Sequence, residues 1–244
     1  MPEGLPHATI PTPDQAVAWL SQHRYDKYLA TASGDHLLAL EIYAWNSELS
    51  AAILRDLAHL EVAVRNALDA ELAPAFPDWA TQSAPVWLRL ENGTQRVRLR
   101  QQRLNNDGLK LLHSAQRDIG AAATHGMVMA RLSFSFWQFL ITPRARESTL
   151  WTPYLHKAFP RGTARADVAK FLESAVSLRN RLAHLEPVAS ASTSVTSRLA
   201  DMNSLFMLVS PEVHDWITEI SDVTEIINHA PVTGLISTSI TQTP

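Results

Sequence analysis

Hydrophobic residues recur every three or four positions along most of the chain, which is the spacing of amphipathic helices. The longest such run extends from Glu41 to Leu72 and contains neither proline nor glycine. We therefore expect one long helix there with a single apolar face. Its apolar positions are Ile42, Trp45, Leu49, Ile53, Leu57, Leu60, Val64 and Leu68.

Shorter helical runs lie on both sides of this one, and no run alternates apolar and polar residues as a strand would. Thr12-Pro13-Asp14 is a typical helix start, and we expect that helix to continue to about Ala30, before Ser33-Gly34-Asp35. The predicted fold class is all-α, a helical bundle. We divide the chain into an N-terminal helix and linker (1–35), a main helical domain (36–230) and a loose C-terminal tail (231–244).

Composition narrows the possible functions. Of the 244 residues, 46% are hydrophobic and the net charge is −3, so any nucleic-acid surface must be a local patch. The chain has no cysteine, no dense carboxylate cluster and no H-E-x-x-H pattern, so we expect no metal and no cofactor. The N-terminus lacks the features of a signal peptide, and the most apolar window (120–142) contains Arg131. We therefore expect a cytoplasmic protein with no membrane segment.

Positive charge gathers between Arg89 and Arg117. Its densest part consists of Arg96, Arg98, Arg100 and Arg103. A charge run of this kind is either a solvated helix face or a patch that binds RNA phosphates, and both interpretations stay open. The segment Asn105-Asn106-Asp107-Gly108 predicts a break or bend in this helix.

The most distinctive stretch is SLRNRLAHLEP, residues 177–187. Apolar spacing predicts a helix from about Thr163 to Glu186, with Asn180 and His184 opposite its apolar face and Arg179 at the border. These side chains suit the solvated last turn of a helix, where cations favour the negative end of the dipole. They also suit a phosphodiester site, in which an arginine holds phosphate and a histidine transfers protons.

Three ordered blocks resemble a known family. Arg179-Asn180, three further residues and His184 match the Arg-polar-x-x-x-His signature of HEPN domains, which are all-α modules found in RNA-cutting toxins and defence proteins. Residues 43–46 with 59–68, and residues 125–137, resemble the long N-terminal helix and the central block of the Abi-like (abortive infection) family. The resemblance covers most of the span from about Tyr43 to Pro187.

This resemblance implies a HEPN-type bundle that is a metal-independent endoribonuclease of phage defence or of a toxin–antitoxin system. A homodimer would bring two signatures to one cleft, and the ribose 2′-OH would attack the adjacent phosphorus. Arg179, Asn180 and His184 would be the catalytic residues, RNA the substrate, and an antitoxin or other regulatory protein a further partner. The alternative is a catalytically silent dimer that binds RNA or a protein partner.

Two further features modify this expectation. By resemblance, Arg65 and Asn66 would support the signature helix, with Glu61 as the partner of Arg65. The alternative is a surface charge ladder, because Glu61, Arg65 and Asp69 follow one another at i,i+4 spacing. Some HEPN domains accept nucleotides on a tyrosine two residues after the histidine. Glu186 occupies that position here, so the resemblance does not extend to this modification.

Overall fold

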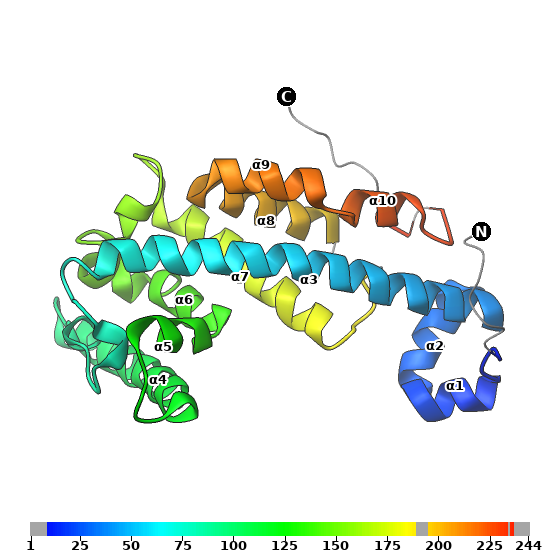
Figure 1. Cartoon of the computed structure of the whole chain (residues 1–244), viewed down its shortest axis with the longest axis horizontal. Coiled ribbons are helices and arrows are strands. Elements are labelled where there is room, and N and C mark those ends of the chain that lie inside the picture. Colours follow the sequence, from blue (N-terminus) through cyan, green and yellow to red (C-terminus); the bar gives the residue numbers. More distant parts are fainter. Residues whose placement is uncertain (1–8, 189–194, 234, 237–244) are drawn as a thin grey trace.

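The computed structural model describes residues 9–188, 195–233 and 235–236. Every regular element within these residues is helical, so the predicted all-α class is confirmed (Figure 1). The α-helices are α1 (Pro13–Leu20), α2 (Gln22–Thr31), α3 (His36–Leu72), α4 (Gln95–Ile119), α5 (His125–Arg131), α6 (Phe134–Ile141), α7 (Arg165–Ala183), α8 (Val195–Val209), α9 (Pro211–Ile220) and α10 (Val223–Asn228). The short 3₁₀ and π turns are η1 (Trp79–Thr81), η2 (Val86–Arg89), η3 (Arg144–Arg146), η4 (Glu147–Trp151) and η5 (Leu155–Ala158).

The long helix α3 spans the molecule, as its uninterrupted apolar spacing predicted. It begins after Asp35, whose carboxylate accepts a hydrogen bond from the Leu38 amide at 3.1 Å and so satisfies one of the free amides of the first turn. In Figure 1, α4 and α5 lie below one end of α3, and α1 and α2 lie below the other. Helices α8 to α10 run along the upper side, and α7 crosses α3 near its middle.

Two apolar clusters hold these helices together. The larger one surrounds α3 and contains the rings of Trp79, Trp87, Phe136 and Trp137, which meet mostly edge to face. The smaller one joins α1 and α2 to the first turns of α3. Its buried members are Ala16, Leu20, Tyr25, Tyr28, Ala32, Ala39 and Ile42.

The helix predicted from Thr12 to Ala30 is instead two helices. Ser21 separates α1 from α2 with a φ of 69°, a left-handed conformation that ends the first helix. The reversal places Ala16 and Leu20 of α1 in the same cluster as Tyr25 and Tyr28 of α2. Burial against α3 therefore accounts for a break that helix propensity did not reveal.

The predicted interruption at residues 105–108 is wrong, because α4 continues through this segment. Asn105 is buried and accepts a hydrogen bond from Arg146 at 2.6 Å. Gly108 lies against two side chains, since a Cβ added there would come within 2.7 Å of Phe139 and 2.9 Å of Leu88. The glycine is thus required for close helix packing and not for a turn.

The signature helix ends earlier than predicted, at Ala183. The Glu186 amide donates to the Arg181 carbonyl (3.1 Å) and the Leu185 amide to the Leu182 carbonyl (2.9 Å), and Leu185 has a φ of 49°. This is a Schellman turn, which normally has glycine or asparagine at the left-handed position. Of the tail predicted to be loose (231–244), residue 234 and residues 237–244 lie outside the described part.

Candidate functional site

Helix α7 carries the signature residues and is packed firmly against the core on its opposite side. Its buried side packs against α3, α6 and α8, and consists of Val168, Ala169, Leu172, Ala175, Val176, Leu178 and Leu182. Arg179, Asn180 and His184 are all exposed. The structure therefore places these side chains away from the core, as the helical spacing predicted.

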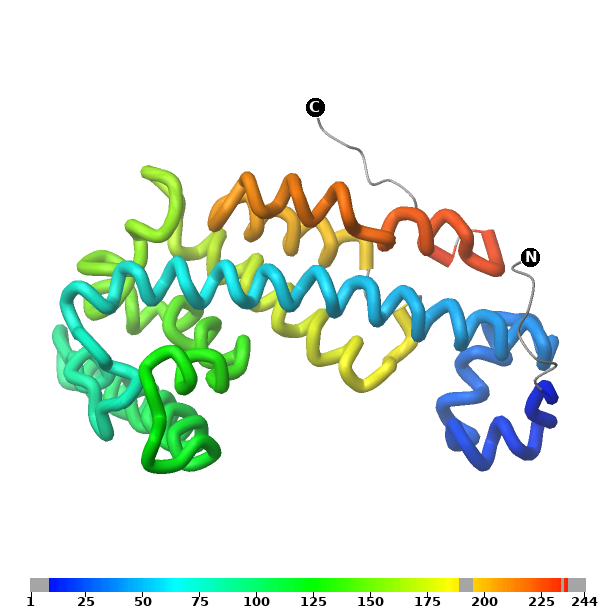
Figure 2. Tube along the Cα trace, viewed as in Figure 1, coloured from blue at the N-terminus to red at the C-terminus, as the bar shows by residue number. Residues whose placement is uncertain are grey.

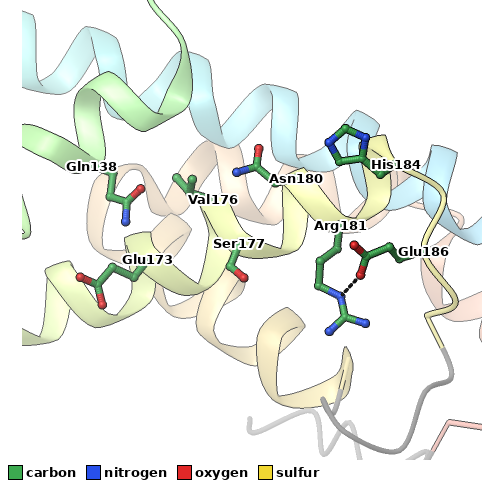
Figure 3. Close-up of a pocket in the computed structure, with 8 residues that line it drawn as sticks. All are labelled: Gln138, Glu173, Val176, Ser177, Asn180, Arg181, His184 and Glu186. Carbon is green, nitrogen blue, oxygen red and sulfur yellow. Dashed lines mark ion pairs between the residues drawn. The ribbon is translucent and has the colours of Figure 1, made fainter.

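A groove of about 360 Å³ lies along the same end of α7 (Figure 3). It is lined by Gln138 of α6 and by Glu173, Val176, Ser177, Asn180, Arg181, His184 and Glu186. Four of these residues follow the helical spacing i, i+4, i+7, i+11 and thus share one face: Glu173, Ser177, Asn180 and His184. This polar stripe was readable in the sequence, but only its last two members were predicted as site residues.

The two carboxylates of the groove differ in their surroundings. Glu186 lies 3.3 Å from the Arg181 guanidinium, and Figure 3 shows this ion pair at the His184 end of the groove. Glu173 is exposed and lies on the same side of α7 as Ser177. Glu186 therefore adds negative charge to the groove that His184 also lines.

Arg179 connects the signature to α3. Its Nη1 donates to Asn180 Oδ1 at 3.3 Å. It is also close enough to Glu61 of α3 for its positive charge to affect that carboxyl electrostatically. Burial raises the pKa of Glu61 above its ordinary value, and the charges of Arg179 and Arg65 and a hydrogen bond from the Phe134 amide lower it in part. The structure therefore brings Glu61, Arg65 and Arg179 into one electrostatic neighbourhood.

The charge ladder that was the other interpretation of Arg65 does not extend to Asp69. The Asp69 carboxylate accepts from Trp79 Nε1 at 2.7 Å and lies 3.1 Å from His125 Nε2, so it faces the central aromatic cluster. Glu61 lies near Arg179 as well as Arg65, as a supporting role would require. Asn66 is exposed on α3 and does not line the groove.

The predicted basic run lies on a different part of the molecule. Arg96, Arg98, Arg100 and Arg103 are all exposed on α4, and none of them lines the groove. At about 100° per residue, Arg96, Arg100 and Arg103 form one stripe away from the buried side of α4, and Arg98 lies nearer to that side. The Cα trace in Figure 2 shows α4 below one end of α3, away from the C-terminal end of α7.

The His184 imidazole takes part in no hydrogen bond or ion pair with the residues that the structure describes. Its main-chain carbonyl, in contrast, accepts a hydrogen bond from Arg24 Nη2 of α2 at 2.9 Å. No signal in the sequence identified Arg24, because the contact joins two distant helices. Within the described ranges, no group of three or more histidine, aspartate or glutamate side chains is placed to hold a metal ion. No helix there is long and apolar enough to cross a membrane.

Chemically, the groove offers an exposed imidazole, two amides, a serine hydroxyl, two carboxylates and the Arg181 guanidinium, whereas Arg179 does not line it. An imidazole can donate or accept a proton near neutral pH, and a guanidinium can bind phosphoryl oxygens. We compared the chain with protein-family models, curated proteins and solved structures, and none matches it. The Abi-like family is therefore a resemblance of sequence motifs alone.

Proposed function

We propose that this chain is a HEPN-type, Abi-like endoribonuclease that cuts RNA at the groove on α7. The observation that carries the proposal is the exposed His184 imidazole at the mouth of this groove, with Asn180 on the same face and Arg179 beside it. The charges of Glu61 and Arg65 on α3 adjoin Arg179, so the signature arginine has charged groups of a second helix beside it.

The reaction that suits these groups is attack of the ribose 2′-OH on the adjacent phosphorus. The P–O5′ bond breaks, which leaves a cyclic phosphate on one product and a 5′-hydroxyl on the other. His184 removes the proton of the 2′-OH or supplies one to the leaving oxygen. Arg179 stabilises the charge on the phosphoryl oxygens, and Asn180 orients the substrate or the arginine. None of these steps uses a metal ion.

The complete reaction needs both an acid and a base, and we propose that a homodimer supplies the second imidazole. Two chains related by a two-fold axis would bring two copies of His184 to one cleft. The arginine stripe of α4 would bind phosphates of the same RNA at a distance from the cleavage site. In the cell, such an enzyme would act in phage defence or as a toxin, with an antitoxin or another regulatory protein as its partner.

A catalytically silent dimer that binds RNA or a protein is the second candidate, and one observation favours it. The groove contains the carboxylates of Glu173 and Glu186, and their negative charge opposes the approach of a phosphate. The two candidates make opposite predictions about RNA cleavage, so one assay separates them.

The test is incubation of the purified protein with total cellular RNA, followed by denaturing electrophoresis. His184→Ala should lower the cleavage rate by about 10² to 10⁴, the usual contribution of a general acid–base group. His229→Ala is the matched control, because His229 is also an exposed residue that caps a helix. If the wild-type protein leaves every RNA intact, the silent dimer becomes the better account.

A further inference from the structure

The turn after α7 fixes where the signature histidine stands. His184 is the first residue beyond the helix, and the Schellman turn directs the chain away through Leu185 in a left-handed conformation. The carbonyls of the last turn need donors, and the turn itself supplies them for Arg181 and Leu182. The His184 carbonyl needs a donor from elsewhere.

That donor is Arg24. Its Nη2 lies 2.9 Å from the His184 carbonyl oxygen, and a guanidinium there also neutralises the negative end of the α7 dipole. Arg24 does not line the groove, so it contacts the histidine backbone from outside the groove.

The helix that carries Arg24, α2, is itself attached to α3. Tyr25, the next residue of α2, is 4% exposed, and its hydroxyl lies 2.7 Å from His36 Nδ1 at the start of α3. Tyr28 is 2% exposed and meets the Tyr43 ring edge to face. The α1–α2 pair therefore holds Arg24 at a constant position relative to α3.

The other end of the same turn is attached to α3. The Val188 amide donates to Asn46 Oδ1 at 2.6 Å, and Asn46 is buried in α3. The segment from His184 to Val188 is thus held at its first residue by α2 and at its last residue by α3. A polar contact at each end leaves the histidine backbone little freedom to move.

We infer that Arg24 is a positioning residue for His184, and that the α1–α2 pair exists in part to set the imidazole at the mouth of the groove. The inference rests on the proposed function for its catalytic consequence, but its structural content can be tested separately. Arg24 contacts the backbone of the histidine and does not line the groove. Its loss should therefore lower kcat and leave KM unchanged.

The experiment compares Arg24→Ala and Arg24→Lys with the control Lys27→Ala, which removes an exposed charge from the same helix. We expect Arg24→Ala to lower kcat by about tenfold to a hundredfold, the usual effect of a displaced catalytic group. Arg24→Lys should recover part of the rate, because an ammonium can still donate to the carbonyl. NMR should show a shifted His184 Cε1–H signal and faster exchange of the Leu185 and Glu186 amides in Arg24→Ala, with neither change in Lys27→Ala.

The outcomes are distinguishable. If the wild-type protein cuts no RNA, the NMR signals still decide whether Arg24 holds the histidine. If the protein cuts RNA but Arg24→Ala matches wild type in kcat and in the His184 signal, the positioning role is refuted and the proposed function stands. If Arg24→Ala does not fold, Tyr25→Phe replaces it. Removing the hydroxyl that binds His36 loosens the attachment of α2 to α3, so it should shift the same His184 signal. An unchanged signal refutes the inference.

Discussion

Glu61 is a residue of the candidate site whose pKa the fold changes. Burial raises its pKa above the ordinary value of 4.5, even though Arg179 and Arg65 oppose the rise. The folded protein therefore binds this proton more tightly than the unfolded chain does. By linkage, the stabilisation is present at low pH and is lost as the pH rises from about 4.5 through the higher folded pKa.

Glu61→Gln should remove this pH dependence. The variant cannot ionise at this position, so its free energy of unfolding should rise relative to wild type as the pH increases from about 4.5 to neutral. Urea unfolding at several pH values measures the difference, with the exposed Glu48→Gln on the same helix as control. A wild-type protein that gains stability relative to Glu61→Gln over this range would show that ion pairing with Arg179 outweighs burial.

At the level of helices, Gly108 tests how closely α4 packs. Gly108→Ala adds a methyl group within 2.7 Å of Phe139, so overpacking at about 1–3 kcal/mol should outweigh the gain in helix propensity of up to about 1 kcal/mol. The matched control is Gly126→Ala in α5, where the added Cβ meets nothing within 4 Å and stability should not fall. Thermal unfolding of both variants checks the sign, and equal melting temperatures would contradict the packing account.

The arginine stripe on α4 should govern RNA binding. Replacing Arg96, Arg100 and Arg103 with glutamine should weaken binding to many RNAs and flatten its salt dependence. With fewer phosphate contacts, binding releases fewer counterions from the RNA. The control makes the same charge change at exposed positions elsewhere, with Arg131, Lys157 and Arg161 replaced. If both triple variants have the wild-type salt slope, the stripe is a solvated face.

The helices themselves could be predicted to different degrees. The apolar spacing of Ile42, Leu49 and Leu60 was sufficient for α3, because one face of that helix packs along most of its length. The break at Ser21 and the continuity of α4 at Gly108 were not predictable, since both depend on side chains that other helices bring into contact. Spacing on α7 placed Arg179, Asn180 and His184 outside the core, but their neighbours Gln138 and Arg24 come from α6 and α2.

On the scale of the whole molecule, the proposed chemistry requires two chains. Of the described residues that line the groove, His184 is the one histidine, and an acid and a base are both needed. Sedimentation velocity at micromolar concentration should therefore give a dimer for wild type, for His184→Ala and for His229→Ala, because neither histidine is needed for folding. A strict monomer that cleaves RNA at full rate would contradict the composite site.

The proposed activity of the α7 groove is RNA cleavage by His184. The most direct measurement is end-group analysis of the products formed in the presence of EDTA. Wild type should give 2′,3′-cyclic phosphate and 5′-hydroxyl ends, and Arg179→Lys should be severely impaired because a point charge cannot replace the bidentate guanidinium. His184→Ala should give no such ends above background. Equal cleavage by His184→Ala, or products with 5′-phosphate ends that form only with added magnesium, would contradict the account.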